Sequence, residues 1–345
     1  GPAPDRVDCR HAVETVLAQD SGQQSRLDAL KRLRRRELLR IAGRDFLDKD
    51  TLRSSTEQLS NLADAMIDGV IRVLRESHIT AGAPPLPGRF VVVGMGKLGG
   101  RELNYSSNID LVYIYVAEAW DEPQKRDDDD DTSVANGEPR QDGAAADHSA
   151  HERFQHFAKE LTTALAQHTD EGYFYRVDLR LRPMGARGNI AYSLAQSRQY
   201  YEALGETFER FAMIKARAVA GDLELGQRFV DMVRPFVYRR YLDHAAIEEL
   251  ARYKARSDRE HAKREPGDRN LKQGRGGIRE VELFTQVFQL LYGGIHPELQ
   301  QPHTVTALQT LREQGFIEQA VLDDLQQAYE FLRRVEHRLQ VVQQS

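Results

Sequence analysis

The sequence predicts a mostly helical α+β fold, with a helical region, a small mixed sheet flanked by helices, and a helical bundle in that order. Apolar residues recur at helical spacing through residues 8–80. Two apolar runs at 90–93 and 111–116, rich in β-branched and aromatic residues, are typical of buried strands. Helical spacing returns after residue 195, where strand signals end, and continues to the end of the chain.

Breaks in these patterns divide the chain into three expected domains. The proline- and glycine-rich stretch 81–88 ends the first helical region. We expect a helical region over 1–85, a core with the sheet over 86–225, and a helical bundle, cut short by the end of the sequence, over 226–345. Gly1-Pro2 is typical of a protease-cleavage remnant, so we expect the chain to be a piece of a longer protein.

The core and the bundle each carry further local signals. Residues 118–150 are rich in Asp, Gly and Ala without periodicity, which predicts a disordered surface insertion. A helix is expected over Phe154–Leu165, and a strand ended by proline over Tyr173–Pro183. One strongly apolar helical face in the bundle is marked by Val281, Phe284, Val287, Phe288 and Leu291.

Charge and cysteine content restrict the class of protein. The 345 residues hold 48 Lys and Arg against 53 Asp and Glu, a net charge of −5. The acidic run Asp127–Asp131 accounts for this excess, so the remainder is close to neutral and general nucleic-acid affinity is not indicated. Cys9 is the single cysteine, and no apolar run is long enough to span a bilayer. We expect a cytoplasmic protein with neither nucleic acid nor membrane as partner.

A glycine-rich turn follows the first predicted strand, in the segment that begins at Gly94 and ends at Asp110. Such a turn lets backbone N–H groups approach a phosphate, and the helix that follows favours negative charge. A lysine and an arginine in the turn add positive charge, and two serines serve as turn residues or phosphate donors. The residues expected at this nucleotide- or phosphate-binding site are Lys97, Gly99, Gly100, Arg101, Ser106 and Ser107.

Two strands are expected to bring acids toward this turn. Asn108 and Asp110 are two residues apart at the mouth of the second strand, so their side chains project from the same face. In the later strand Asp178 alternates with apolar neighbours and is flanked by Arg180 and Arg182. A solvated strand face would explain this alternation, whereas a strand beside the second one would aim Asp178 at Asn108 and Asp110.

Converging carboxylates beneath a phosphate-binding turn suit two-metal phosphoryl transfer. Mg²⁺ prefers oxygen ligands, and a pair of ions roughly 3.5–4 Å apart clamps the attacking and leaving oxygens. We therefore expect Asp110, Asp178 and Asn108 as catalytic residues and metal ligands. Arg180 and Arg182 are expected to neutralise charge on the transferred group or on its leaving phosphate.

The motif from Gly96 to Leu111 resembles the nucleotidyltransferase signature of glutamine synthetase adenylyltransferase, a family with a polymerase-β-like fold. The resemblance extends through most of the chain and includes the acid that the family places third, here Asp178. The supporting motifs are Arg34-Arg-Arg-Glu-Leu-Leu-Arg-Ile41, Arg176-Val-Asp-Leu-Arg-Leu-Arg-Pro183, Arg210-Phe-Ala-Met-Ile-Lys-Ala-Arg217, Arg234-Pro-Phe-Val-Tyr-Arg-Arg-Tyr241 and Gly276-Gly-Ile-Arg-Glu-Val-Glu282.

The resemblance implies an activity and partners. The motifs at 234–241 and 276–280 look like the N-terminal, adenylyl-removing half of the family. In that half, inorganic phosphate attacks the AMP–tyrosine bond on glutamine synthetase and releases ADP. The implied partners are glutamine synthetase, a PII-type signal protein, nucleotide and phosphate, and the implied cofactor is Mg²⁺. The ATP-dependent adenylylating half is the alternative.

The resemblance also gives a second set of cationic and acidic residues a possible place near the anion. Arg279, Glu280 and Glu282 begin a helix, where early acids stabilise the helix dipole, and the family match adds a phosphate-site or hinge role. Lys215 and Arg217 either reach the anion site or form surface ion pairs.

One position departs from the family pattern, because Asn108 stands where the family has an aspartate. An amide oxygen still ligates a metal, but the site loses a negative charge and with it affinity for Mg²⁺. Three explanations are open: an engineered isosteric substitution that inactivates the enzyme, natural divergence that weakens activity, and a fold retained for binding alone.

Two other classes of function compete with this interpretation. The glycine spacing from Gly94 to Gly99, with Glu118 at the expected ribose position, also fits a dinucleotide-binding fingerprint. The segment before Asn108 holds barely two helical turns, too short for the crossover helix of such a domain. The other alternative is a helical interaction module without catalysis, which would lack metal-dependent nucleotide binding.

Overall fold

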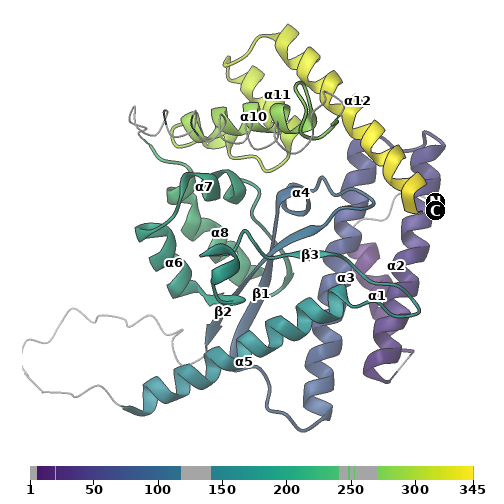
Figure 1. The fold of residues 1–345 in the computed structure, drawn as a ribbon, viewed down its shortest axis with the longest axis vertical. Helices are drawn as coiled ribbons and strands as arrows, with labels where there is room; N and C mark the ends of the chain where they lie inside the picture. The colour runs from purple at the N-terminus through teal and green to yellow at the C-terminus, as the bar shows by residue number, and fades with distance from the viewer. Residues whose placement is uncertain are drawn as a thin grey trace, which may run out of the picture.

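A computed structural model describes residues 6–19, 21–117, 141–240, 248, 252 and 270–344. Helices cover both faces of a small mixed sheet, and a further group of helices lies at one end of it (Figure 1). The predicted α+β, mostly helical fold is confirmed.

The sheet consists of β1 (Gly88–Met95), β2 (Ile109–Ala117), β3 (Val177–Asp178), β4 (Ala191–Ser193) and β5 (Arg217–Gly221). Strand β1 is antiparallel to β2 and to β5, whereas β3 and β4 run parallel to β2. The order is β3-β2-β1-β5, and β4 pairs with β2 further along that strand. The beginning of β2 therefore lies directly beside β3.

Strand β1 separates two hydrophobic cores. Phe90 and Val92 belong to the core on one face of the sheet, while Val91 and Val93 belong to the core on the other. All four side chains are fully buried. Burial on both faces explains why the sequence of this strand is uninterruptedly apolar instead of alternating.

Each core is closed by its own helices. One face is covered by α1 (Arg6–Leu17), α2 (Gln23–Phe46), α3 (Leu52–Thr80) and α5 (Gln141–Ala166). The other face is covered by α6 (Leu194–Ala203), α7 (Thr207–Met213) and α8 (Leu223–Val237). The helices expected over residues 8–80 are thus confirmed as α1, α2 and α3.

The C-terminal helices form a third core at one end of the sheet. They are α10 (Ile278–Tyr292), α11 (Thr304–Glu313) and α12 (Gln319–Gln344). The short helices within the described residues are α4 (Gly96–Gly99), η2 (Gly185–Arg187) and η3 (Pro297–Leu299). The apolar residues of α10 divide between two cores, because Val281, Phe284 and Phe288 pack into the third core. Val287 and Leu291 pack against the α6–α8 side of the sheet. Helix α10 therefore joins the C-terminal helices to the sheet.

The strand predicted over Tyr173–Pro183 is wrong in length, since only Val177 and Asp178 pair with β2. The Asp178 carboxylate accepts a hydrogen bond from the backbone N–H of Arg180 at 2.9 Å, and Arg182 N donates to Leu179 O at 3.2 Å. These local hydrogen bonds turn the chain and compete with continued strand pairing.

The predicted insertion over 118–150 also requires correction. Residues 118–140 lie outside the described residues, but 141–150 form the beginning of α5. Ala150 is buried in the first core, and the His151 ring is hydrogen-bonded through Nδ1 to the hydroxyl of Tyr115 at 2.6 Å. The helix predicted over Phe154–Leu165 therefore begins more than three turns earlier in the chain.

Strands β4 and β5 were not predicted. Strand β5 lies beyond residue 195, where strand signals were expected to end, yet its Val219 and Ala220 are fully buried. Both strands are short, and neither has a long alternating pattern. They form because β2 and β1 offer unpaired edges, which is a tertiary and not a local cause.

None of the helices in the described ranges is long and apolar enough to cross a lipid bilayer.

Substitution of Gly99 by alanine is expected to lower the free energy of unfolding by about 2 kcal/mol or more, because overpacking forces backbone shifts. A Cβ on Gly99 would lie 1.8 Å from the backbone oxygen of Lys215 and 2.6 Å from that of Gly94. Urea unfolding measures the effect.

The control is Gly43→Ala in α2, where a Cβ meets nothing within 4 Å. This helical substitution is expected to stabilise the chain by roughly 0.5–1 kcal/mol. Equal effects of the two substitutions would contradict the close packing inferred at Gly99.

Candidate active site

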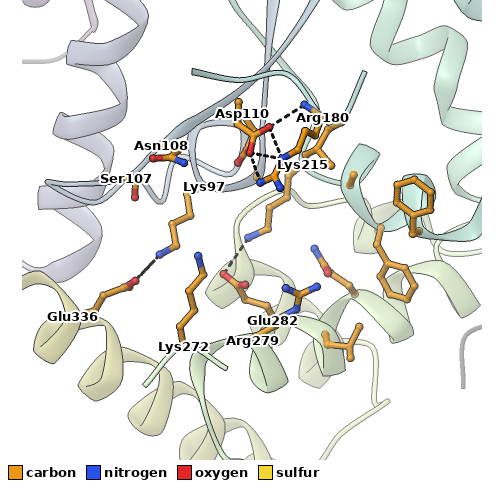
Figure 2. A pocket seen from close by; sticks show the side chains of 18 of the residues that line it. Lys97, Ser107, Asn108, Asp110, Arg180, Lys215, Lys272, Arg279, Glu282 and Glu336 are labelled. Atoms are coloured by element: carbon orange, nitrogen blue, oxygen red, sulfur yellow. Dashed lines mark hydrogen bonds and ion pairs between the residues drawn. The ribbon is translucent and has the colours of Figure 1, made fainter. Parts of the chain in front are cut away.

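A cavity of about 500 Å³ lies between the end of the sheet and the C-terminal helices. Its wall is built from the turn after β1, the start of β2, β3, α7, α10 and α12. Side chains from α4, α10 and α12 and from the loop before α10 point into it (Figure 2). The polar residues of the wall are Lys97, Ser106, Ser107, Asn108, Asp110, Asp178, Arg180, Lys215, Lys272, Arg279, Glu282, Gln286, Glu336 and Gln340.

Two aspartates lie side by side in the wall. Asp110 and Asp178 occupy paired positions of the parallel strands β2 and β3. On its other side Asp110 is paired with Met95 of β1, immediately before Gly96. Gly96 has φ +52, and a Cβ there would lie 2.6 Å from the Asp110 carboxylate. Only glycine therefore lets the turn and this carboxylate approach so closely.

The two carboxylates differ in pKa. Burial, and then the negative charge of Asp178, raise the pKa of Asp110 to about 6. Hydrogen bonds from Arg180 lower the pKa of Asp178, to which the guanidinium donates from Nε and Nη2. Asp178 is thus held ionised. A cation bound between the two strands would stabilise the ionised form of Asp110 and lower its pKa.

The loop before β2 supplies the remaining oxygen atoms. Asn108 precedes the strand by one residue and is exposed at the cavity, where Ser107 also lies (Figure 2). The backbone of Ser106 is held from two sides. Its N–H donates to Gln340 Oε1 at 3.1 Å, and its carbonyl accepts from Arg176 Nη2 at 2.7 Å. The loop therefore has a fixed course up to Asn108.

Lysines from three segments converge on the cavity. Lys97, Lys215 and Lys272 point into the space between Asp110 and the C-terminal helices (Figure 2). Lys97 Nζ lies 2.9 Å from Glu336 Oε1. Burial, followed by repulsion from Arg333, lowers the pKa of Lys97 to about 8 against the attraction of Glu336. A phosphate anion entering the cavity would find positive charge on several sides.

Four of the residues predicted for the site do not line the cavity. Gly99 packs against the backbone of Lys215, and a Cβ on Gly100 would lie 2.9 Å from both Glu102 Oε2 and the backbone oxygen of Pro302. Arg101 donates to Asn61 Oδ1 at 2.7 Å and so points toward α3. Arg182 donates to the carbonyls of its own turn, among them Asn189 O at 2.8 Å. These contacts hold the framework of the site.

The cationic and acidic residues that only the family resemblance placed near the anion fall into two groups. Lys215, Arg279 and Glu282 line the cavity, whereas Arg217 is paired with Asp64 of α3 at 2.6 Å. Lys272, Glu336, Gln340 and Phe208 line it without having been predicted. Glu336 and Gln340 lie about two hundred residues or more beyond the glycine turn in a helix whose pattern is unremarkable, so no local signal indicates them.

The donor set suits a hard divalent cation. Asp110 and Asp178 are adjacent carboxylates, and the amide oxygen of Asn108 lies at the same cavity. Within the described ranges no group of three or more His, Cys, Asp and Glu side chains is arranged to hold a metal. The candidate Mg²⁺ ligands are therefore two carboxylates and one amide, which is one charge fewer than three carboxylates would provide.

The glycine turn does not belong to a dinucleotide-binding domain. Only the four residues of α4 form a helix between β1 and β2, and the two strands are antiparallel. A dinucleotide-binding unit requires parallel strands joined by a crossover helix. This alternative for the Gly94–Gly99 spacing is therefore wrong.

Comparison with known families agrees with the geometry. Residues 3–232, more than half of the chain, match the family model of glutamate-ammonia ligase adenylyltransferase. The chain belongs to this family. Residues 244–345 match a second model, that of GlnD PII-uridylyltransferase.

Curated relatives cover nearly the whole chain. The chain is 41% identical over 319 residues to a bifunctional glutamine synthetase adenylyltransferase/adenylyl-removing enzyme of Pseudomonas aeruginosa. The aligned region covers 91% of the chain and 30% of that relative. It is 39% identical over 346 residues to the enzyme of the same description from Pseudomonas putida, with 99% and 33% covered. The relative from Nitrosococcus oceani is 40% identical over 330 residues, with 94% and 32% covered. The chain spans about a third of the length of these relatives.

Asp110→Asn is expected to stabilise the fold at pH 7.5 by roughly 1–3 kcal/mol, since one pKa unit corresponds to about 1.4 kcal/mol. The pKa of Asp110 is higher in the folded chain than in the unfolded chain, so its ionised form destabilises the fold above about pH 6. The stabilisation should shrink as the pH falls toward the unfolded pKa of about 4.

Urea unfolding of both proteins at pH 7.5 and pH 4.5 measures this difference. Asp170→Asn, at an exposed position, serves as the control for loss of one negative charge. A stabilisation that is independent of pH, or none at all, would contradict the burial of a charge at Asp110.

Proposed function

We propose that this chain removes AMP from an adenylylated tyrosine of glutamine synthetase by phosphorolysis. The observation that supports it most directly is the pairing of Asp110 and Asp178 across parallel strands, at a cavity with several lysines and arginines in its wall. The motifs at 234–241 and 276–280 favour this removing direction over the adenylylating one.

The proposed reaction transfers AMP from tyrosine to phosphate. An oxygen of hydrogen phosphate bonds to the phosphorus of AMP, the bond from that phosphorus to the tyrosine oxygen breaks, and the proton of the phosphate passes to the tyrosine oxygen. ADP and the unmodified protein are the products. Mg²⁺ supplies charge neutralisation and orientation when it is bound by Asp110, Asp178 and the amide oxygen of Asn108.

The cations of the wall have a part in this scheme. The oxygens of two phosphate groups, the attacking phosphate and the AMP phosphate, bring their negative charges together as the bond to phosphorus forms, and fixed positive groups stabilise such charge. Lys97, Lys272 and Arg279 line the cavity from three different segments of the chain. We assign them to the incoming phosphate and the transferred AMP phosphate, with Lys97 exchanging its contact to Glu336 for the anion.

An apolar section of the wall suits the adenine base. It consists of Leu181, Phe208, Phe211, Ala212 and Leu283. Phe208, on α7, keeps 39% of its surface exposed. Helices α7 and α12 lie on opposite sides of α4 (Figure 1), so this section is distant from the Lys97–Glu336 pair. We therefore place the base against α7 and the attacking phosphate toward α12.

Glutamine synthetase is the proposed protein substrate, and a PII-type signal protein is a proposed regulatory partner. The similarity to bifunctional glutamine synthetase adenylyltransferase/adenylyl-removing enzymes supports the first. The match of residues 244–345 to the PII-uridylyltransferase model supports the second.

Asn108→Asp is expected to raise phosphate-dependent ADP release from adenylylated glutamine synthetase by about tenfold or more, equivalent to about 1.4 kcal/mol in the barrier. The substitution adds a third carboxylate to the Asp110–Asp178 pair, so it should also tighten Mg²⁺ binding. The assay measures ADP with Mg²⁺ and phosphate present, and calorimetry measures the affinity for Mg²⁺.

Asn189→Asp provides the control, because Asn189 is exposed and outside the cavity. ADP release and Mg²⁺ affinity that do not change in Asn108→Asp would refute the metal site. Transfer of AMP from ATP to unmodified glutamine synthetase, without phosphorolysis, would assign the adenylylating direction instead. Absence of metal-dependent nucleotide binding in both proteins would favour an interaction module.

Phe208→Ala is expected to weaken AMP binding by about tenfold, in line with roughly 1–3 kcal/mol for stacking of a base on an aromatic ring. Binding of ribose 5-phosphate, which lacks the base, should not change. Calorimetry on both ligands makes the comparison, and Phe331→Ala is the control, since Phe331 is 65% exposed on α12 and outside the cavity. An equal loss of affinity for AMP and ribose 5-phosphate would contradict the placement of the base against Phe208. A loss seen only with the adenylylated protein substrate would contradict it as well.

A further inference from the structure

One face of α12 carries a row of polar side chains against the loop that leads from the glycine turn to Asn108. The row consists of Tyr329, Arg333, Glu336, His337 and Gln340, which we call the α12 polar face. Their spacing of four, three, one and three residues places them on one side of a helix. Phe331, on the opposite side of the helix, is 65% exposed, and Leu339, at the edge of the polar row, is 50% exposed.

Arg333 makes the central contact of this face. Its side chain is 1% exposed, and Nη2 donates to the backbone oxygen of Glu102 at 2.6 Å and to the side-chain oxygen of Asn104. Nη1 donates to the hydroxyl of Tyr329 at 2.9 Å. A planar guanidinium fixes the direction of each of these bonds, so the backbone between residues 102 and 104 has little freedom to shift.

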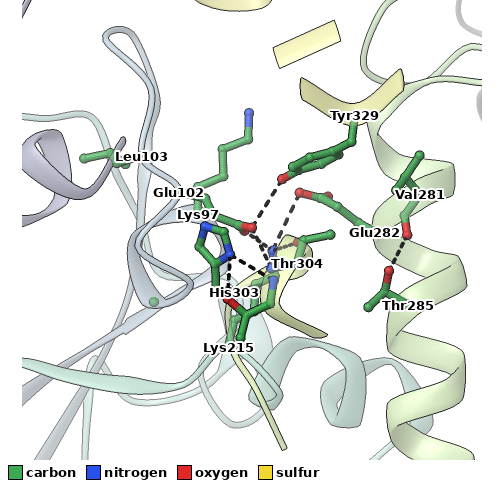
Figure 3. A network of polar contacts seen from close by, with 12 residues as sticks. Lys97, Glu102, Leu103, Lys215, Val281, Glu282, Thr285, His303, Thr304 and Tyr329 are labelled. Atoms are coloured by element: carbon green, nitrogen blue, oxygen red, sulfur yellow. Dashed lines mark hydrogen bonds and ion pairs between the residues drawn. The ribbon is translucent and has the colours of Figure 1, made fainter. Parts of the chain in front are cut away.

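The side chain of Glu102 fixes the same stretch from a second direction. Its carboxylate accepts hydrogen bonds from Lys215 Nζ at 2.5 Å, from the backbone N–H of Thr304 at 2.8 Å and from the Tyr329 hydroxyl at 3.3 Å (Figure 3). These donors come from the segment before β5, the start of α11 and α12. Three separate parts of the chain thus meet at one carboxylate of the loop.

The remaining members of the polar face contact the loop on either side of this point. His337 Nε2 donates to Asn104 Oδ1 at 3.0 Å, and Gln340 Oε1 accepts from Ser106 N at 3.1 Å. Glu336 pairs with Lys97 at 2.9 Å. Successive turns of the helix therefore hold residues 97, 102, 104 and 106, and the loop ends in Asn108 and Asp110 at the cavity.

Stability alone does not account for this arrangement. Buried charged groups are often replaced by apolar residues of similar size without loss of stability, whereas hydrogen-bonded networks fix geometry. Helix α12 buries an arginine and a histidine here and exposes Phe331 and Leu339. The side that faces the loop is thus suited to hold it in one position.

We propose that the α12 polar face positions the catalytic loop, with Arg333, His337 and Gln340 as positioning residues for the reaction. The assignment of a reaction rests on the proposed function, whereas the positioning of residues 97–108 does not. Since α12 lies within the part that matches the PII-uridylyltransferase model, the site is complete only when this part is docked on the sheet. Displacement of α12 would release Lys97, Ser106 and Asn108 together.

The test compares variants of the whole chain in two measurements. Arg333→Met and His337→Leu keep the volume of the side chain and remove the hydrogen bonds, and His337→Gln keeps a donor toward Asn104. Arg334→Met is the control, because Arg334 is exposed and next to Arg333 but not on the polar face. The measurements are hydrogen exchange of the amides in 103–108 and steady-state ADP release.

We expect faster amide exchange in 103–108, unchanged exchange in β1, and kcat lower by roughly tenfold to a hundredfold, as for a misplacement of about 1 Å. The affinity for AMP should fall less than kcat, because the base is placed against α7 and Lys272 and Arg279 do not belong to the displaced loop. His337→Gln should have a kcat well above that of His337→Leu and close to that of the unchanged protein. Arg334→Met should resemble the unchanged protein in both measurements.

Exchange in 103–108 that stays slow in Arg333→Met would overturn the proposal, whatever the activity. The proposal would also be overturned if kcat is as low in His337→Gln as in His337→Leu and if kcat falls in proportion to the free energy of unfolding across the variants. The α12 polar face would then have a structural role only. Absence of ADP release from the unchanged protein would count against the proposed function alone, because the exchange measurement needs no turnover.

Discussion

Glu102 is 2% exposed, and its carboxylate accepts hydrogen bonds from Lys215, Thr304 and Tyr329. Burial by itself raises the pKa of such a group, but the positive charges of Lys215, His303 and Arg333 outweigh it and hold the pKa of Glu102 below its usual range. A buried charge that loses one partner is strongly destabilising. The glycine turn, the segment before β5 and the C-terminal helices are therefore constrained to meet at this residue.

The sheet places the glycine turn and the two aspartates at one end of the fold. Because β1 is buried on both faces, its end is fixed between two cores, and the turn at Gly96 follows directly. The antiparallel neighbour β2 returns the chain to the same end, where Asp110 lies beside the turn. The parallel pairing of β3 then adds Asp178. Loop, turn and acids are held by backbone pairing on one side and by α12 on the other.

Sequence patterns predicted a large part of this arrangement. Alternation around Asp178 and the spacing of Asn108 and Asp110 indicated acids on strand faces, and those residues do line one cavity. The prediction that a phosphate would contact Arg101 and Arg182 remains untested, although both make framework contacts instead. The strand around Asp178 was predicted too long because its pairing ends where the Asp178 carboxylate accepts a hydrogen bond from the backbone of Arg180. Such a local turn does not change the alternation of polar and apolar residues.

By itself the sequence determined the helices of the first 80 residues, the strands β1 and β2, the glycine turn between them and the acids next to it. These features depend on interactions between residues close together in the chain, which leave a period or a turn signature. Only the tertiary structure decided which strands pair with β2, that β5 exists, and that Glu336 and Gln340 of α12 face the cavity. Those outcomes depend on burial and on hydrogen bonds between residues that lie tens to hundreds of positions apart in the chain, for which a local pattern carries no signal.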